Sequence, residues 1–119
     1  MQKKLLFISH KTPYGSFAAK EALDAALASA AFGQDISLLF KGDGVYQLLP
    51  QQNASLLERK SIGAILGALE LYEVNKVFVC EQSLLSRGLK NIKPLIKVHA
   101  LDNPSLQVLF SEQDHILSF

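Results

Sequence analysis

Cysteine, methionine and tryptophan are the scarcest residues in this chain, which has one cysteine, Cys80, one methionine and no tryptophan. A single thiol cannot form an internal disulfide. The three histidines, His10, His99 and His115, are too dispersed to give a recognisable zinc spacing with Cys80. We therefore expect neither a disulfide framework nor a bound metal, and no motif indicates another cofactor.

Charged residues and long apolar runs are scarce as well. Charged residues make up only 19% of the chain, and its 12 basic residues are scattered and give a net charge of +1. A direct nucleic-acid binder normally has a clustered basic patch. The longest apolar runs, such as LLFI and VFVC, are far shorter than the roughly 20 residues of a membrane span, and polar residues follow the first run too soon for a signal peptide. We expect a cytoplasmic protein that contacts neither membrane nor nucleic acid directly.

Apolar residues are abundant, at 49% of 119 residues. This share exceeds that of a typical soluble domain. The length fits a single domain over residues 1–119. The excess predicts either an unusually complete core or an apolar surface that meets a partner.

Short apolar runs alternate with amphipathic segments along the chain. The runs at residues 4–9, 36–40, 77–80 and 95–99 and the closing HILSF predict strands. Helical spacing predicts long helices over residues 16–32 and 53–72, a short helix after Cys80, and a fourth that opens at Asp102 or Asn103 before Pro104. The order predicts an α/β fold: one three-layer domain with a mainly parallel sheet of about five strands and helices on both faces.

Glycines punctuate the two long helices. Gly33 follows the last periodic residue of the first helix, as a helix stop does. Gly63 and Gly67 interrupt the second helix and weaken it. We expect them to pack closely against another backbone.

Ligands of open parallel sheets collect beyond the carboxyl ends of the strands. The segments there are HKTPYGS, KGDGVYQ, CEQSLLSRG and ALDNP, which predicts that His10, Asp43 and Cys80 lie along one sheet edge. HKTPYGS precedes a helix and offers N–H groups to a small anion, but it lacks the GxxxxGK[ST] and GxGxxG nucleotide-binding patterns. The following VYQLLP is either a satellite of the core or an exposed contact patch.

Cys80 allows two interpretations. An unpaired cysteine is often a small buried hydrophobe. Alternatively, a thiol between a strand and a helix faces unpaired N–H groups that stabilise its thiolate, and Arg87 would add positive charge if it folds back, whereas Glu81 opposes both. No histidine is fixed beside Cys80 by spacing, so a Cys-His triad has little support.

Several stretches together resemble the DsrE/DsrF-like sulfur-relay proteins. They are TPYGS with the alanine-rich helix after it, LLFKGDGVYQLLP, VFVCEQSLLSRGL and the closing HILSF, and GDGVYQLLP is the most specific. The resemblance runs nearly end to end. It implies a role in 2-thiolation of the tRNA wobble uridine, in which sulfur passes as a persulfide from a cysteine desulfurase through carriers to a thiouridylase.

The resemblance also implies partners and a position for the sulfur. It implies a heterohexamer with TusB-like and TusD-like subunits, indirect contacts with a sulfur carrier and a thiouridylase, and Cys80 at the persulfide position. In the sulfur-accepting subunit the residues after that cysteine are mostly small and apolar, whereas this chain has Glu81 and Gln82. A carboxylate beside the sulfur disfavours an anionic persulfide by like-charge repulsion.

Three functions follow in order of preference. The first is an accessory, non-catalytic subunit of a sulfurtransferase complex. The second is a direct persulfide carrier that uses Cys80. The third is a free-standing flavodoxin-like module that binds a small anion at HKTPYGS.

Overall fold

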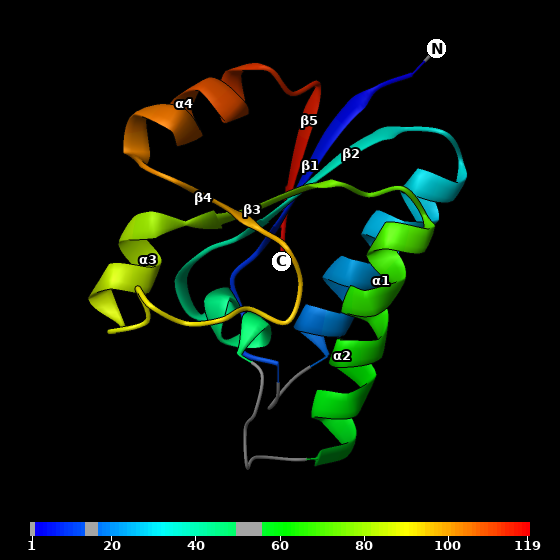
Figure 1. Cartoon of the computed structure of the whole chain (residues 1–119). Helices are drawn as coiled ribbons and strands as arrows, with labels where there is room; N and C mark the ends of the chain where they lie inside the picture. Colours follow the sequence, from blue (N-terminus) through cyan, green and yellow to red (C-terminus); the bar gives the residue numbers. More distant parts are fainter. Residues whose placement is uncertain (1, 14–16, 50–55) are drawn as a thin grey trace.

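The computed structural model describes residues 2–13, 17–49 and 56–119, without the side chains of residues 56–63. Five strands form one parallel sheet in the order β4-β3-β2-β1-β5 (Figure 1). The strands are β1 (Lys4–Ser9), β2 (Asp35–Phe40), β3 (Lys76–Cys80), β4 (His99–Leu101) and β5 (His115–Ser118). The predicted α/β fold with a parallel sheet is confirmed.

The described residues form four α-helices around this sheet. They are α1 (Ala18–Ala31), α2 (Leu56–Leu71), α3 (Glu81–Ser86) and α4 (Asn103–Ser111), and a 3-10 turn, η1 (Gly42–Leu48), follows β2. Figure 1 shows α1 and α2 side by side on one face of the sheet and α4 on the other. The short α3 and η1 lie at the carboxyl ends of β3 and β2, so both border the edge where ligands of parallel sheets collect.

The fourth strand begins later than the sequence predicts. The apolar run at 95–99 contributes only its last residue, His99, to β4. Pro94 has no N–H to give to a ladder, and the N–H of Leu95 donates to the carbonyl of Leu48 at 2.9 Å. The run is therefore tied to η1 rather than to β3.

Capping residues explain where the helices begin and end. Asp102 accepts a hydrogen bond from the N–H of Ser105 at 3.0 Å, with Pro104 in the first turn, as predicted for the start of α4. Gly33 ends α1 with a φ of +83°, also as predicted. The expectation of close packing at Gly67 is wrong, since a Cβ there would meet nothing within 4 Å, and Gly63 lies outside the described side chains.

Side chains alternate across the sheet and fill two cores. The larger core lies between the sheet and α1 and α2 and contains Phe7, Leu38 and Phe40, and the smaller lies under α4. Burial of one large apolar side chain contributes about 1.5–3 kcal/mol to folding. In the part of the chain that the structure describes, no helix is long and apolar enough to cross a membrane.

The last strand closes the sheet against the first. The N–H of Asp114 donates to the carbonyl of Lys4, and the N–H of Lys4 donates to the carboxylate of Asp114, each at 2.8 Å. Phe119 stacks on Phe7 with ring centroids 6.2 Å apart. Residues more than a hundred positions apart in sequence therefore hold each other in place.

Candidate functional site

The carboxyl ends of β1, β2 and β3 meet at one edge of the sheet. Ser9 is in register with Phe40, and Phe40 with Val79, so Cys80 lies one residue beyond that row. Adjacent strands are about 4.8 Å apart, which puts β1 and β3 about 10 Å apart. His10, Asp43 and Cys80 do therefore lie along one edge, as the sequence predicts.

Cys80 is the last residue of β3 and the N-cap residue of α3. Its side chain is 3% exposed and packs in the core under α4, together with Ile8, Leu39 and Leu106. The sulfur makes no capping hydrogen bond to the N–H groups of α3. The thiol thus sits in apolar surroundings, while the next residue, Glu81, is exposed.

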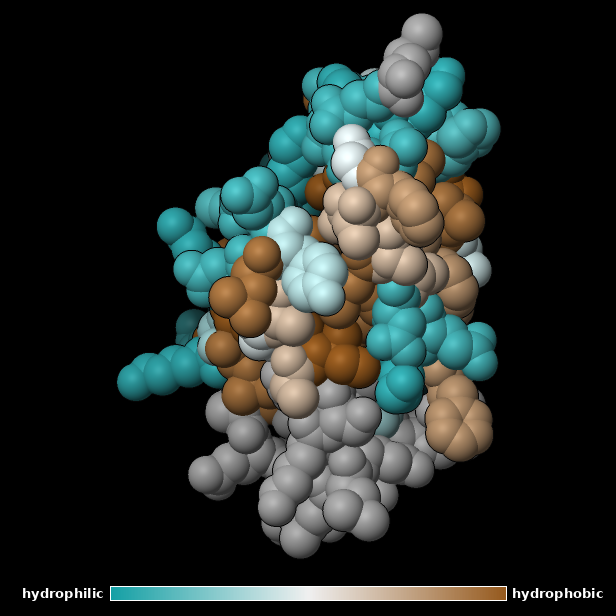
Figure 2. Space-filling model, turned by 90° about the vertical axis from the view of Figure 1, so that its right-hand side faces the viewer, coloured by the Kyte–Doolittle hydropathy of each residue, from teal (hydrophilic) through white to brown (hydrophobic). Residues whose placement is uncertain are grey.

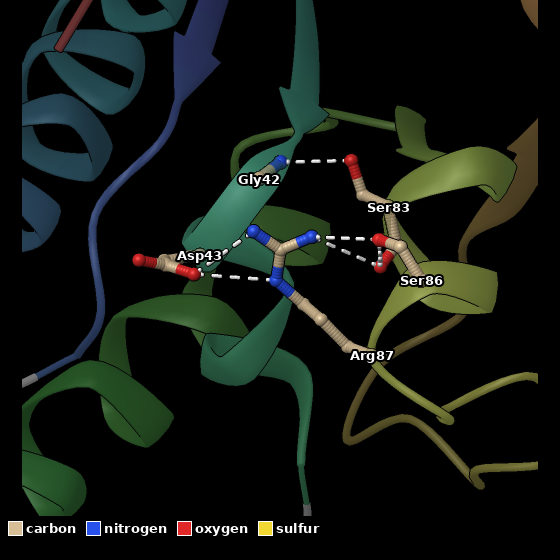
Figure 3. Close-up of polar contacts among 5 residues, drawn as sticks. All are labelled: Gly42, Asp43, Ser83, Ser86 and Arg87. Carbon is tan, nitrogen blue, oxygen red and sulfur yellow. Dashed lines mark hydrogen bonds and ion pairs between the residues drawn. The ribbon is translucent and has the colours of Figure 1, made fainter.

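Arg87 folds back toward the start of α3, but it binds other partners. Its Nη1 donates to the Ser83 carbonyl at 3.2 Å and to Ser86 Oγ at 3.1 Å, while Nε and Nη2 donate to Asp43 Oδ1 at 3.2 and 3.0 Å (Figure 3). The carboxylate of Asp43 therefore balances the guanidinium charge. Arg87 joins α3 to η1 and adds no unpaired charge next to the thiol of Cys80.

The turn after β2 is docked on the end of β1. A Cβ at Gly44 would lie 1.9 Å from the carbonyl oxygen of Ser9, so only glycine fits this approach. Gly42 has a φ of +56°, and its N–H donates to Ser83 Oγ at 2.9 Å (Figure 3). Fully buried Gln47 donates from Nε2 to Ser9 Oγ at 2.7 Å and to the Lys11 carbonyl at 2.9 Å.

The open question about VYQLLP is settled for the described residues 45–49. Val45 and Leu48 are fully buried in the larger core. Tyr46 and Leu49 are half-buried. The stretch is part of the core rather than an exposed contact patch, and its buried side chains anchor η1 to that core.

The three histidines lie in different surroundings. A hydrogen bond of 2.7 Å joins His10 Nε2 and Ser118 Oγ, and partial burial, followed by the charges of Lys41 and Lys11, lowers the pKa of His10. His99 starts β4 at the opposite side of the sheet, and exposed His115 starts β5. Among the described residues, no group of three or more His, Cys, Asp or Glu side chains could hold a metal ion.

Sequence reasoning missed the buried polar residues that assemble this edge. Ser9, Gln47 and Ser83 are all buried and all bind η1 or lie within it. A polar residue that ends an apolar run, as Ser9 ends KLLFIS, was the available signal. The predicted anion site in HKTPYGS falls partly on residues 14–16, which lie outside the described residues.

Comparison with known proteins gives a consistent result. The family model of the DsrE/DsrF-like family matches residues 3–119. The chain is 37% identical over 116 residues to a Protein TusC homolog of Vibrio parahaemolyticus, with 98% of each chain covered. It is 36% identical over 118 residues to a Protein TusC homolog of Pseudomonas aeruginosa, with 99% of each covered. It is also 36% identical over 118 residues to Protein TusC of Klebsiella pneumoniae, with 98% of this chain and 99% of the relative covered.

A solved structure shares the fold. The ychN protein from E. coli superposes with a TM-score of 0.82 over 100% of both chains, at 24% sequence identity. At this identity the likeness concerns the arrangement of helices and strands alone.

Proposed function

The chain belongs to the DsrE/DsrF-like family, and on that premise we propose that it is a TusC-type subunit of a sulfur relay. The relay passes persulfide sulfur toward 2-thiolation of the wobble uridine in tRNA. Identity of 36–37% with curated TusC proteins over almost the whole chain supports this assignment. Within the relay the chain has an accessory role rather than that of sulfur acceptor.

The burial of Cys80 is the observation that carries the accessory role. Sulfur transfer requires a sulfur atom that an incoming persulfide can reach. The thiol is 3% exposed, and Arg87, a nearby cation on α3, is paired with Asp43. These surroundings suit a packing residue better than a nucleophile.

The alternative is a direct persulfide carrier that uses Cys80. Its place at the carboxyl end of a parallel strand, before a helix, favours this reading. The carrier role would require the core under α4 to open, so that the sulfur becomes accessible. It would therefore leave a persulfide on this chain, which the accessory role does not.

The partners in our proposal are TusB-like and TusD-like subunits in a cytoplasmic heterohexamer. Large apolar side chains are exposed where α1 and α2 end, and we call Phe32 (85% exposed), Leu71 (83%) and Tyr72 (49%) the helix-end patch. Figure 2 looks onto the side where α1 and α2 lie and shows hydrophobic surface across its middle. Exposed patches of this kind mark protein interfaces.

A reconstituted relay with labelled cysteine tests the accessory role. In Cys80→Ala the rate of sulfur transfer to tRNA should stay within about twofold of the native rate, because no covalent step uses this thiol. Mass spectrometry of the native chain during turnover should detect no added sulfur on Cys80. A fall in transfer of about a hundredfold or more, from a complex that still assembles, would favour the carrier reading.

A second experiment tests the partner surface. Phe32→Asp together with Leu71→Asp should abolish co-purification with TusB-like and TusD-like subunits, because it puts charge into an apolar interface. The matched control is Val108→Asp, which makes the same kind of change at a 58% exposed position on α4. Equal recovery of the complex from both variants would place the interface elsewhere.

A further inference from the structure

The two outer strands of the sheet, β4 and β5, differ in how they are protected against pairing with another strand. β4 has three residues, and charged Lys97 and Asp102 and the helix-opening Pro104 flank it. β5 reads HILS, and both of its faces are partly open, since Ile116 is 47% and Leu117 38% exposed. Exposed edge strands usually have charges, prolines or bulges that prevent pairing. β5 itself has no proline, lysine or acidic residue, and the carboxylate of Asp114, which precedes it, is bound to the N–H of Lys4.

The hydrogen bonds to β1 determine which backbone groups of β5 face outward. Phe119 donates its N–H to the Ile8 carbonyl at 2.9 Å and accepts from the His10 N–H at 3.1 Å, so its backbone faces β1. Along a strand in a ladder the direction of these groups alternates from residue to residue. Leu117 therefore also faces β1, and the N–H and C=O groups of Ile116 and Ser118 face the free edge.

We propose that this edge pairs with the same edge of a second copy of the chain, antiparallel about a two-fold axis at Leu117. Ile116 then lies opposite Ser118 of the copy, and the symmetry repeats this pair on the other side of the axis. Each such pair exchanges two N–H···O bonds. The two Leu117 side chains meet across the axis as a non-hydrogen-bonded pair, the arrangement in which cross-strand side chains are closest.

The occupant is a second copy because the edge is complementary to itself. In this register each outward donor of one strand meets an outward acceptor of the other, as a two-fold interface requires. A register shifted to bring Ser118 opposite position 114 fails, because the N–H of Asp114 already donates to Lys4. No two like charges lie opposite each other over residues 115–119, whose titratable side chain is that of His115.

The size of the contact sets its strength. Two four-residue strands bury less than the roughly 1,200–2,000 Å² of a stable protein interface. The isolated chain should therefore dimerise weakly, and the fraction of dimer should rise with protein concentration. The contact strengthens wherever an assembly holds two copies near each other, because the effective concentration rises. This inference does not rest on the sulfur-relay role.

Disulfide trapping tests the pairing in the full chain, alone and co-expressed with its relay partners. In a Cys80→Ala background, Leu117→Cys should form a disulfide-linked homodimer at least about tenfold faster than Val108→Cys, because only position 117 meets its own copy at disulfide distance. Val108 is the matched control, since it is exposed but lies on α4, away from the edge.

A second measurement keeps the native cysteine and Leu117. By sedimentation, Ile116→Lys should weaken self-association at least about tenfold, because an edge lysine opposes strand pairing, whereas Val108→Lys should leave it unchanged. Equal trapping at positions 117 and 108 would overturn the proposal. So would trapping of position 117 with a different subunit only, which would assign the edge to another partner.

Discussion

Two neighbouring regions at the carboxyl ends of the strands are built in opposite ways. At the ends of β1 and β2 the backbones of Gly44 and Ser9 are in tight contact, and the buried Nε2 of Gln47 donates a hydrogen bond to Ser9 Oγ. At the end of β3 the thiol of Cys80 only packs among apolar side chains. Cys80, whose side chain is the most reactive of these residues, thus lies in the region that has fewer specific polar and backbone contacts.

The two regions differ in what they offer to sulfur chemistry. A site that handles sulfur must expose its reactive atom, whereas the β3 end buries the thiol of Cys80. The β1–β2 end fixes the shape of the η1 turn through Gly42, Gly44, Ser83 and Gln47. A closely packed turn beside a buried thiol is compatible with the accessory role proposed above.

The largest expected effect is a loss of folding stability when a glycine at the β1–β2 end is substituted. Gly44→Ala should lower the free energy of unfolding by about 3 kcal/mol or more, because its Cβ would overlap the Ser9 carbonyl and move the backbone. Gly42→Ala should cost about 1–2 kcal/mol, because its φ is positive but its surroundings have room. Urea unfolding measures both values.

Gly67→Ala is the control for these variants. Its surroundings are open, so the substitution should stabilise the helix by about 0.5–1 kcal/mol. If Gly44→Ala were as stable as Gly67→Ala, the close contact between η1 and β1 would be refuted.

The next effect concerns the β3 end. Cys80→Ser should lower the free energy of unfolding by about 1–3 kcal/mol, because it buries a hydroxyl in an apolar core. Cys80→Ala should cost less than Cys80→Ser, since it adds no polar group. Alkylation of the native thiol should be far slower in buffer than in urea. Fast alkylation of the folded chain would contradict the packing role.

A smaller loss of stability is expected when the ion pair between Asp43 and Arg87, which joins η1 to α3, is removed. Asp43→Asn removes the ion pair with Arg87, in which the side chains are 57% and 25% exposed. Exposed ion pairs contribute about 0.2–1 kcal/mol, and salt screens them. The loss in thermal stability should therefore shrink at high salt. Asp24→Asn, which breaks the exposed pair with Lys20, is the control and should cost no more.

The smallest effect is a pH dependence at the end of β1. The lowered pKa of His10 means that the unfolded chain binds this proton more readily than the folded chain. Stability should therefore fall slightly as the pH drops below the ordinary histidine pKa of 6.5. His10→Asn should remove this part of the acid sensitivity in melting experiments, whereas His115→Asn should not. Identical acid profiles for native protein and His10→Asn would refute it.

The sequence predicts the elements better than the contacts between them. Alternating apolar runs and helical spacing indicated the parallel sheet, and Asp102 with Pro104 indicated the start of α4. The docking of η1 could not be predicted, because Gln47 and Ser9 are 38 positions apart and meet only once β1 and β2 pair. The direction of Arg87 depended likewise on Asp43, 44 positions away.

The pairing of β5 with β1 has a consequence for folding. Lys4 and Asp114 bind each other across 110 positions, so one side of β1 stays open until β5 docks. Contacts between such distant residues slow folding, because a long loop must close before they form. The sheet is therefore completed late in folding, and until then the open side of β1 is the surface that a chaperone would need to shield.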